Sequence, residues 1–121
     1  MTRANFGALM AWASEGMDED TIDEFWKCFG DAERRRAQLE LYRSGDFEKI
    51  APYDGKLAEL GVPTLLIWGR HDQFSRLGGA KRFEQQIPGA ELVVLDDAGH
   101  FVWEDHPDRC SRELTRFLAT L

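Results

Sequence analysis

The run from Val62 to Gly69 constrains the fold more than any other segment. Its sequence, Val-Pro-Thr-Leu-Leu-Ile-Trp-Gly, is rich in residues that favour β-strands and shows no alternation of polar and apolar positions. Such a strand is expected to be buried on both faces, as in a parallel sheet covered by helices. Pro63 can occupy only one of the first positions, because proline cannot donate to the ladder. We therefore expect a strand over Thr64–Trp68.

A helix, a second strand and a last helix are predicted after this run. Residues 77–87 have a helical pattern that ends at Pro88-Gly89, and residues 91–95, Glu-Leu-Val-Val-Leu, form the second apolar run. Pro107 suits the first position of a last helix. A strand–helix–strand connection of this kind makes the two strands parallel. Residues 57–121 are therefore predicted to form a strand–helix–strand–helix unit.

The N-terminal part is predicted to be helical. From Phe6 to Leu60, apolar residues recur at three- and four-residue steps. Thr21 with Glu24 predicts a capping box, and Asp31 is a candidate N-cap for the next helix. The apolar run 6–13 is similar to a short signal peptide. The run is short, however, and the preceding residues, with Asn5 and a single arginine, are not typical of a signal peptide, so we favour a helix with one apolar face. We expect a helical segment over residues 1–56.

Length, charge and cysteine content limit the kinds of binding partner and the cellular compartment that we expect for this protein. The 121 residues allow one domain at most, and the net charge of −7 repels phosphate backbones and anionic headgroups. Nucleic acid and membrane surfaces are therefore not expected as partners. No apolar run approaches the roughly 20 residues that span a bilayer. Two distant cysteines without a CxxC motif favour a reducing compartment, so we expect a cytoplasmic protein.

The predicted sheet is too small to protect its own central strand. The apolar Thr64–Trp68 run should have a neighbour on each side, and the sequence offers only residues 91–95. One edge of this apolar strand is left with unpaired backbone N–H and C=O groups, to which another strand can bind. Either another polypeptide covers this edge, or the chain is part of a larger protein.

The residues best suited to chemistry follow the two predicted strands. In open α/β sheets, ligands bind beyond the carboxyl ends of the strands, and parallel neighbours bring their loops to one edge. Asp72 and His100 can therefore meet. A carboxylate bonded to one ring nitrogen fixes the histidine tautomer and leaves the other nitrogen as a general base. Alternatively, Asp72 closes a turn, His100 is structural, or Asp97 is the acid.

Two aromatic residues and the remaining histidines complete the set of candidates. Phe74 and Phe101 follow the two chemical candidates closely and are expected to line a substrate pocket. The three histidines show no HxH or HxxxH spacing, so we expect neither a metal nor another cofactor.

Two segments together resemble the end of the α/β-hydrolase fold. Residues 63–72, Pro-Thr-Leu-Leu-Ile-Trp-Gly-Arg-His-Asp, resemble its penultimate strand and acid loop, and residues 95–101, Leu-Asp-Asp-Ala-Gly-His-Phe, resemble its last strand and histidine loop. The resemblance covers residues 57–121, and residues 1–56 are more loosely similar to the helical cap of that family. It implies a partial fold, in which two parallel strands with flanking helices follow a cap-like segment. Residues 101–107 resemble the haloalkane dehalogenase and epoxide hydrolase branch.

The resemblance implies a hydrolase whose nucleophile is missing from this sequence. Family members carry serine or aspartate in a G-x-Nuc-x-G elbow before the cap, and no two glycines here are four residues apart. The chain would supply His100 and Asp72 without nucleophile or oxyanion hole, and we expect it to be inactive alone towards an ester, halide or epoxide. Its partners would be a small-molecule substrate and an N-terminal hydrolase half. In the alternative interpretation, the chain is a non-catalytic interaction protein that pairs with a partner or itself through the open strand edge.

Overall fold

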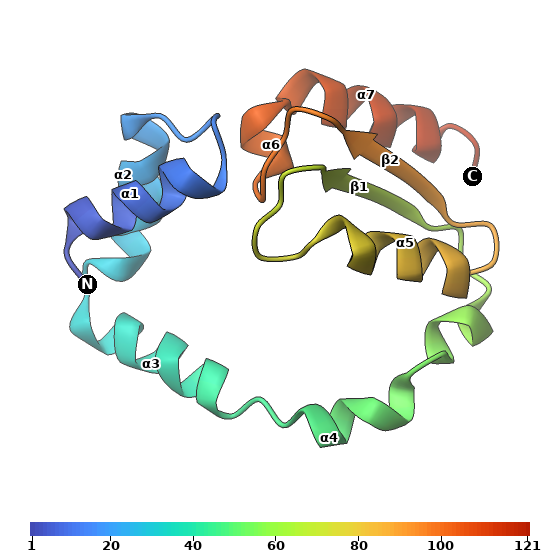
Figure 1. Cartoon of the computed structure of the whole chain (residues 1–121), viewed down its shortest axis with the longest axis horizontal. Helices are drawn as coiled ribbons and strands as arrows, with labels where there is room; N and C mark the ends of the chain where they lie inside the picture. The colour runs from blue at the N-terminus through green and yellow to red at the C-terminus, as the bar shows by residue number, and fades with distance from the viewer.

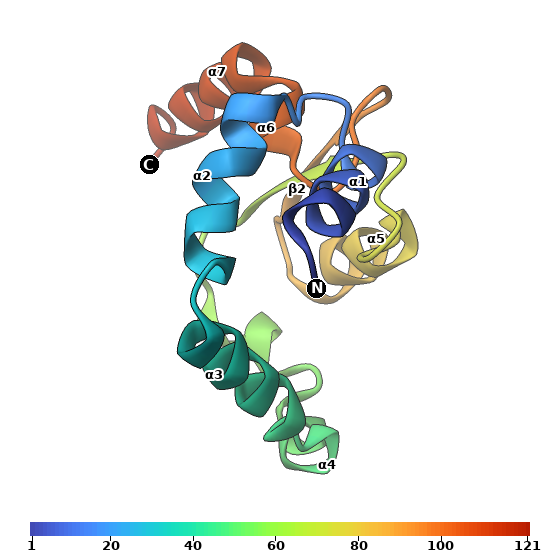
Figure 2. The same cartoon turned by 90° about the vertical axis from the view of Figure 1, so that its left-hand side faces the viewer.

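The structure, a computed structural model, describes residues 1–121, apart from the side chain of residue 47. The N-terminal half is helical, as the periodicity predicts. Two eleven-residue helices are followed by a segment that curves in a wide arc from the end of the second helix to the first strand (Figures 1 and 2). The elements are α1 (Arg3–Ala13), α2 (Glu19–Phe29), α3 (Ala32–Arg43), α4 (Phe47–Ile50) and the 3-10 turns η1 (Ala51–Tyr53) and η2 (Lys56–Leu60).

The C-terminal half is the predicted strand–helix–strand–helix unit with one additional short helix. Strands β1 (Leu65–Gly69) and β2 (Glu91–Leu95) pair in parallel, with Leu65 opposite Glu91 and Gly69 opposite Leu95. Helix α5 (Leu77–Gln86) packs on one side of this sheet, and α6 (Val102–Asp105) and α7 (Pro107–Leu118) pack on the other (Figure 1). Helix α7 begins at Pro107, as predicted.

The strands are less buried than the sequence predicts. The first four residues of β1 are only partly buried, and the same holds for β2. Three helices contact a sheet of two five-residue strands, and in the described part of the chain β1 has no neighbour other than β2. Helices lie on both faces of the sheet, as predicted, but the burial of the strand residues is only partial, and the predicted bare edge is present.

The start of α2 also differs from the prediction. The N-cap is Asp18, whose carboxylate accepts the amide hydrogen of Thr21 at 2.8 Å. This bond lowers the pKa of Asp18. Thr21 therefore lies inside the first turn instead of starting a capping box. The Asp31 cap of α3 is confirmed, since its side chain accepts from the amide of Glu33 at 2.6 Å.

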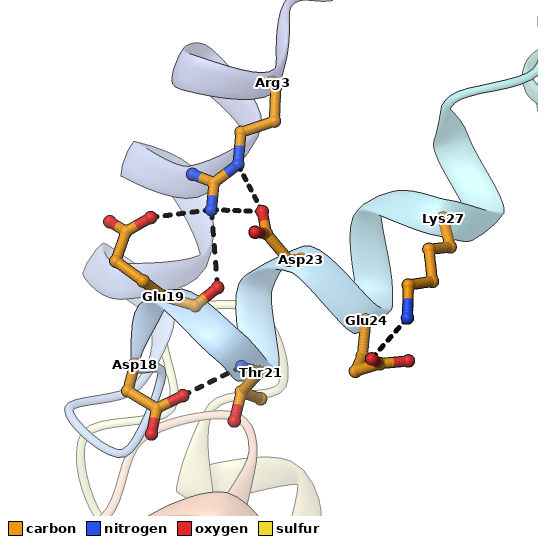
Figure 3. Close-up of polar contacts among 7 residues, drawn as sticks. All are labelled: Arg3, Asp18, Glu19, Thr21, Asp23, Glu24 and Lys27. Atoms are coloured by element: carbon orange, nitrogen blue, oxygen red, sulfur yellow. Dashed lines mark hydrogen bonds and ion pairs between the residues drawn. The ribbon is translucent and has the colours of Figure 1, made fainter.

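An arginine on α1 joins the first two helices (Figure 3). The guanidinium of Arg3 lies 2.6 Å from Glu19 Oε2 and donates from Nε to Asp23 Oδ1 at 2.7 Å. The bond to Asp23, together with Glu19, raises the pKa of Arg3. Phe6 and Ile22 belong to a small apolar core between the helices. The α1–α2 pair thus has packing of its own.

None of the helices in the described part of the chain combines the length and the apolar character needed to cross a bilayer.

Candidate active site

Asp72 and His100 lie against each other at the carboxyl ends of the two strands. Asp72 is in the loop after β1 and His100 in the loop after β2. The Nδ1 atom of His100 is 3.0 Å from each carboxylate oxygen of Asp72. The structure thus brings together the two side chains that the sequence predicts to meet.

The carboxylate of Asp72 is buried and held by its own loop. Its side chain is 6% exposed. Oδ1 also accepts the amide hydrogens of Phe74 at 2.9 Å and of Ser75 at 2.7 Å. The alternative role, closing a turn, is therefore present beside the contact with His100. A carboxylate has enough lone pairs for all of these bonds.

Two glycines allow the histidine loop to approach the acid loop and the end of α1. A Cβ atom at Gly69 would overlap the carbonyl oxygens of Ala98 and Gly99, and one at Gly99 would overlap that of Ala13. The amide of His71 donates to Ala98 at 2.9 Å, which joins the two loops directly. Only glycine fits at these two positions without moving the backbone.

The loop that carries His100 is held by acceptors that sequence reasoning missed. The amide of His100 donates to the carbonyl of Ala13 at 2.8 Å, and that of Phe101 donates to Ser14 Oγ at 2.7 Å. The amide of Gly99 donates to Asp105 Oδ2 at 2.6 Å. Since Ser14 and Phe101 are 87 residues apart, no local pattern could have revealed the contact between them.

An aromatic cavity opens beside His100. Its volume is about 670 Å³. The rings of Phe74 and Phe101 lie edge-on to the imidazole, with centroids 5.0 and 4.9 Å away, and both line the cavity. Helices α1 to α3 supply the other wall. Its lining from these helices includes Phe6, Met10, Phe25 and Tyr42.

The other titratable candidates lie elsewhere. Asp97, the alternative acid, has its Oδ1 2.9 Å from His106 Nε2. His71 is exposed. Among the residues that the structure describes, no three His, Cys, Asp or Glu side chains come together as metal ligands would.

Comparison with known proteins decides the family. A family model described as alpha/beta hydrolase fold matches residues 2–107. The chain belongs to the alpha/beta hydrolase fold family. This hydrolase-fold chain is 30% identical over 104 residues to the hydrolase YugF of Bacillus subtilis, and the match covers 84% of the chain and 36% of YugF.

Other relatives carry names that include a substrate. The 2-hydroxy-6-oxononadienedioate/2-hydroxy-6-oxononatrienedioate hydrolase of Klebsiella pneumoniae is 36% identical over 72 residues, which are 60% of this chain and 25% of that protein. The hydrolase-fold chain therefore spans about a third or less of these relatives' length. The names of these relatives do not mention halides or epoxides, and the dehalogenase or epoxide hydrolase branch stays a prediction.

Two solved structures share the fold. The serine hydrolase CarC, involved in carbazole degradation, superposes with a TM-score of 0.81 at 22% identity, over 99% of this chain and 48% of CarC. The 2-hydroxy-6-oxo-6-phenylhexa-2,4-dienoate hydrolase BphD from Rhodococcus sp. strain RHA1 also gives 0.81, at 23% identity, over 98% of this chain and 44% of BphD. At this identity the likeness shows the fold alone.

Proposed function

We propose that Asp72 and His100 are the acid and base of a hydrolase whose nucleophile is supplied by residues outside these 121. The observation that carries this proposal is the position of His100 Nδ1, 3.0 Å from both oxygens of a buried carboxylate. Family membership supports the hydrolase class.

The geometry suits general-base catalysis. The Asp72 carboxylate favours a proton on Nδ1 of His100, which leaves the lone pair of Nε2 free to accept one. Nε2 would take the proton of a serine hydroxyl, or of the hydrolytic water in an enzyme with an aspartate nucleophile. Asp72 would then stabilise the imidazolium. The amides of Phe74 and Ser75 keep the carboxylate in place during this step.

Residues 1–56 would act as the cap over the substrate. The cavity beside His100 has one wall from α1 to α3 and another from the loops after β1 and β2. Its aromatic lining favours a substrate with an apolar body, which an ester, a halide or an epoxide can have. The names of the relatives add a 2-hydroxy-6-oxo dienoate to the compounds worth testing.

The nucleophile is the part that these residues lack. The serines are Ser14, Ser44, Ser75 and Ser111, and none has the two flanking glycines of an elbow. Ser14 Oγ accepts the amide hydrogen of Phe101, which gives this hydroxyl a structural partner. Ser75 lines the cavity, but it lies in the irregular loop between β1 and α5.

Ester hydrolysis by the isolated chain tests this proposal. We expect its rate with p-nitrophenyl acetate to equal that of the His100→Ala variant, because a base without a nucleophile and oxyanion hole gives no turnover of the family type. Several turnovers per chain that His100→Ala abolishes would overturn the proposal that the nucleophile lies elsewhere. The Ser75→Ala variant would then show whether Ser75 supplies it.

A second candidate function rests on the free edge of β1. Within the described residues β1 pairs only with β2, and its side chains are partly exposed. Such an edge can accept another strand, so a non-catalytic protein that pairs with a partner or itself is the alternative. Light scattering after size-exclusion chromatography tests self-pairing. A folded monomer at micromolar concentration would count against it.

A further inference from the structure

Three consecutive amides around His100 each have a different acceptor. The N–H groups of residues 99, 100 and 101 donate to Asp105 Oδ2, to the Ala13 carbonyl and to Ser14 Oγ, at 2.6, 2.8 and 2.7 Å. Two of the acceptors lie at the end of α1, and the third lies at the end of α6. The backbone that carries the imidazole is therefore fixed from two sides.

Asp105 also fixes the loop after α1. Its Oδ1 accepts the amide hydrogen of Gly16 at 2.7 Å, while Oδ2 accepts that of Gly99. One carboxylate thus joins two loops that are far apart in sequence. A Cβ at Gly16 would overlap the backbone of Glu104 and Asp105, so this approach requires glycine. The same loop includes Ser14, the acceptor for Phe101.

We propose that Asp105, with Ser14, is a positioning residue for His100. Its carboxylate aligns the loop after α1 with the histidine loop, so that the imidazole presents Nδ1 to Asp72 and leaves Nε2 for chemistry. This inference rests on the proposed role of His100 and adds the device that orients it.

The chemistry of the side chain explains why a carboxylate is needed. Both oxygens of Asp105 accept N–H groups, and a carboxylate can accept at both ends. An asparagine presents an NH₂ group at one end, which would face an N–H donor. Asp105→Asn should therefore release either Gly16 or Gly99, although it keeps the size of the side chain. Ser14→Ala removes the acceptor for Phe101 while leaving Asp105 intact.

The tautomer of His100 distinguishes a positioning role of Asp105 and Ser14 from a merely structural one, because a structural role alone would not change the tautomer. In ¹H–¹⁵N spectra of the imidazole, we expect the unaltered chain to show His100 as the Nδ1–H tautomer with a low-field Nδ1 proton, assigned by its loss in His100→Gln. Asp105→Asn and Ser14→Ala should each lose the low-field proton and show a mixture of tautomers. Glu104→Gln, on the same short helix, should leave the signal unchanged.

The outcomes separate this inference from the proposed function. If the unaltered chain lacks the low-field proton, the Asp72–His100 pair itself fails. If the signal is present and survives in folded Asp105→Asn and Ser14→Ala, the positioning role is overturned. If both substitutions prevent folding, amide hydrogen exchange in the unaltered chain tests whether Asp105 holds the two loops. Gly16 and Gly99 should then be protected to the same degree, and exchange of either at the rate of an unfolded chain would overturn the inference.

Discussion

Asp72 is the residue on which the site depends most. It accepts bonds from two amides of its own loop and lies beside the imidazole of His100. Parallel strands place their following loops at one edge, and for this reason the meeting of Asp72 and His100 could be predicted from sequence. The bonds from Phe101 to Ser14 and from Gly16 to Asp105 could not, because their partners are 87 and 89 residues apart in the sequence.

We expect Asp72→Ala to lower the free energy of unfolding by about 1–3 kcal/mol, because the amides of its loop lose their acceptor. Urea unfolding followed by circular dichroism measures this change. Asp96→Ala is the matched control, since Asp96 makes an exposed ion pair with Arg70 and should change stability by less than about 1 kcal/mol. Equal effects of the two substitutions would show that the Asp72 bonds do not stabilise the loop.

The glycines give a second prediction at this scale. Gly99→Ala would place a methyl group against the carbonyl of Ala13, and we expect a loss of about 3 kcal/mol or more. Gly79→Ala, in α5 with open space around the position, should instead stabilise the chain by about 0.5–1 kcal/mol. Thermal unfolding of both variants checks the contrast. A Gly99→Ala variant as stable as the unaltered chain would contradict the close approach of the histidine loop to the end of α1.

At the scale of elements, segments with a clear hydrophobic pattern can be predicted from the sequence. A single helical turn, and the choice between two possible capping residues, cannot. The apolar runs located β1 and β2, and Pro107 located the start of α7. Helix α6 has four residues, too few for a periodic pattern, and it was missed. The cap of α2 was misplaced because Asp18 and Thr21 both suit an N-cap, and only the observed bond distinguishes them.

Helix α7 should protect its cysteine. Cys110 lies on this helix and is fully buried, and burial raises the pKa of its thiol, so little thiolate is available. Cys28 is exposed. We expect iodoacetamide at pH 8 to modify Cys28 alone in the folded chain and both cysteines in urea, as counted by mass spectrometry. Equal rates for the two in the folded chain would mean that α7 is not docked.

An ion-pair network on α7 predicts a pH dependence. The hydrogen bond from Arg116, together with Arg109, lowers the pKa of Glu113 below its ordinary value of 4.5. A lowered pKa stabilises the folded state above the ordinary value, and this stabilisation is lost as the pH falls through the lowered one.

The Glu113→Gln variant tests this sign. In low salt it should melt slightly below the unaltered chain at pH 7, and the difference should become smaller as the pH falls below 4.5. The difference should be small because the network is at the surface. A gap that stays the same or widens as the pH falls from 7 to 3 would show that the charge of Glu113 is not its cause.

At the scale of the whole molecule, the free sheet edge and the partial coverage of similar structures both agree with the proposal that a further part of the hydrolase fold completes the site. When the chain is superposed on CarC and BphD, nearly all of its own residues align, but they correspond to less than half of either structure. It carries an acid and a histidine in contact, one wall of a cavity from helices, and a strand with a free edge. The bare edge could be predicted because β1 is apolar and the sequence offers only one other strand to pair with it. The partial burial could not, because it depends on how many helices reach the sheet.

The most direct test joins the chain to the part of the fold that it does not contain. The N-terminal portion of YugF, up to the matched region, would be fused ahead of residue 1, and hydrolysis of p-nitrophenyl acetate would be measured. We predict no His100-dependent turnover by the chain alone, turnover by the fusion, and its loss in the fusion with His100→Ala. His100-dependent turnover by the chain alone, or an active fusion that is indifferent to His100→Ala, would contradict the proposed roles of His100 and of the missing nucleophile.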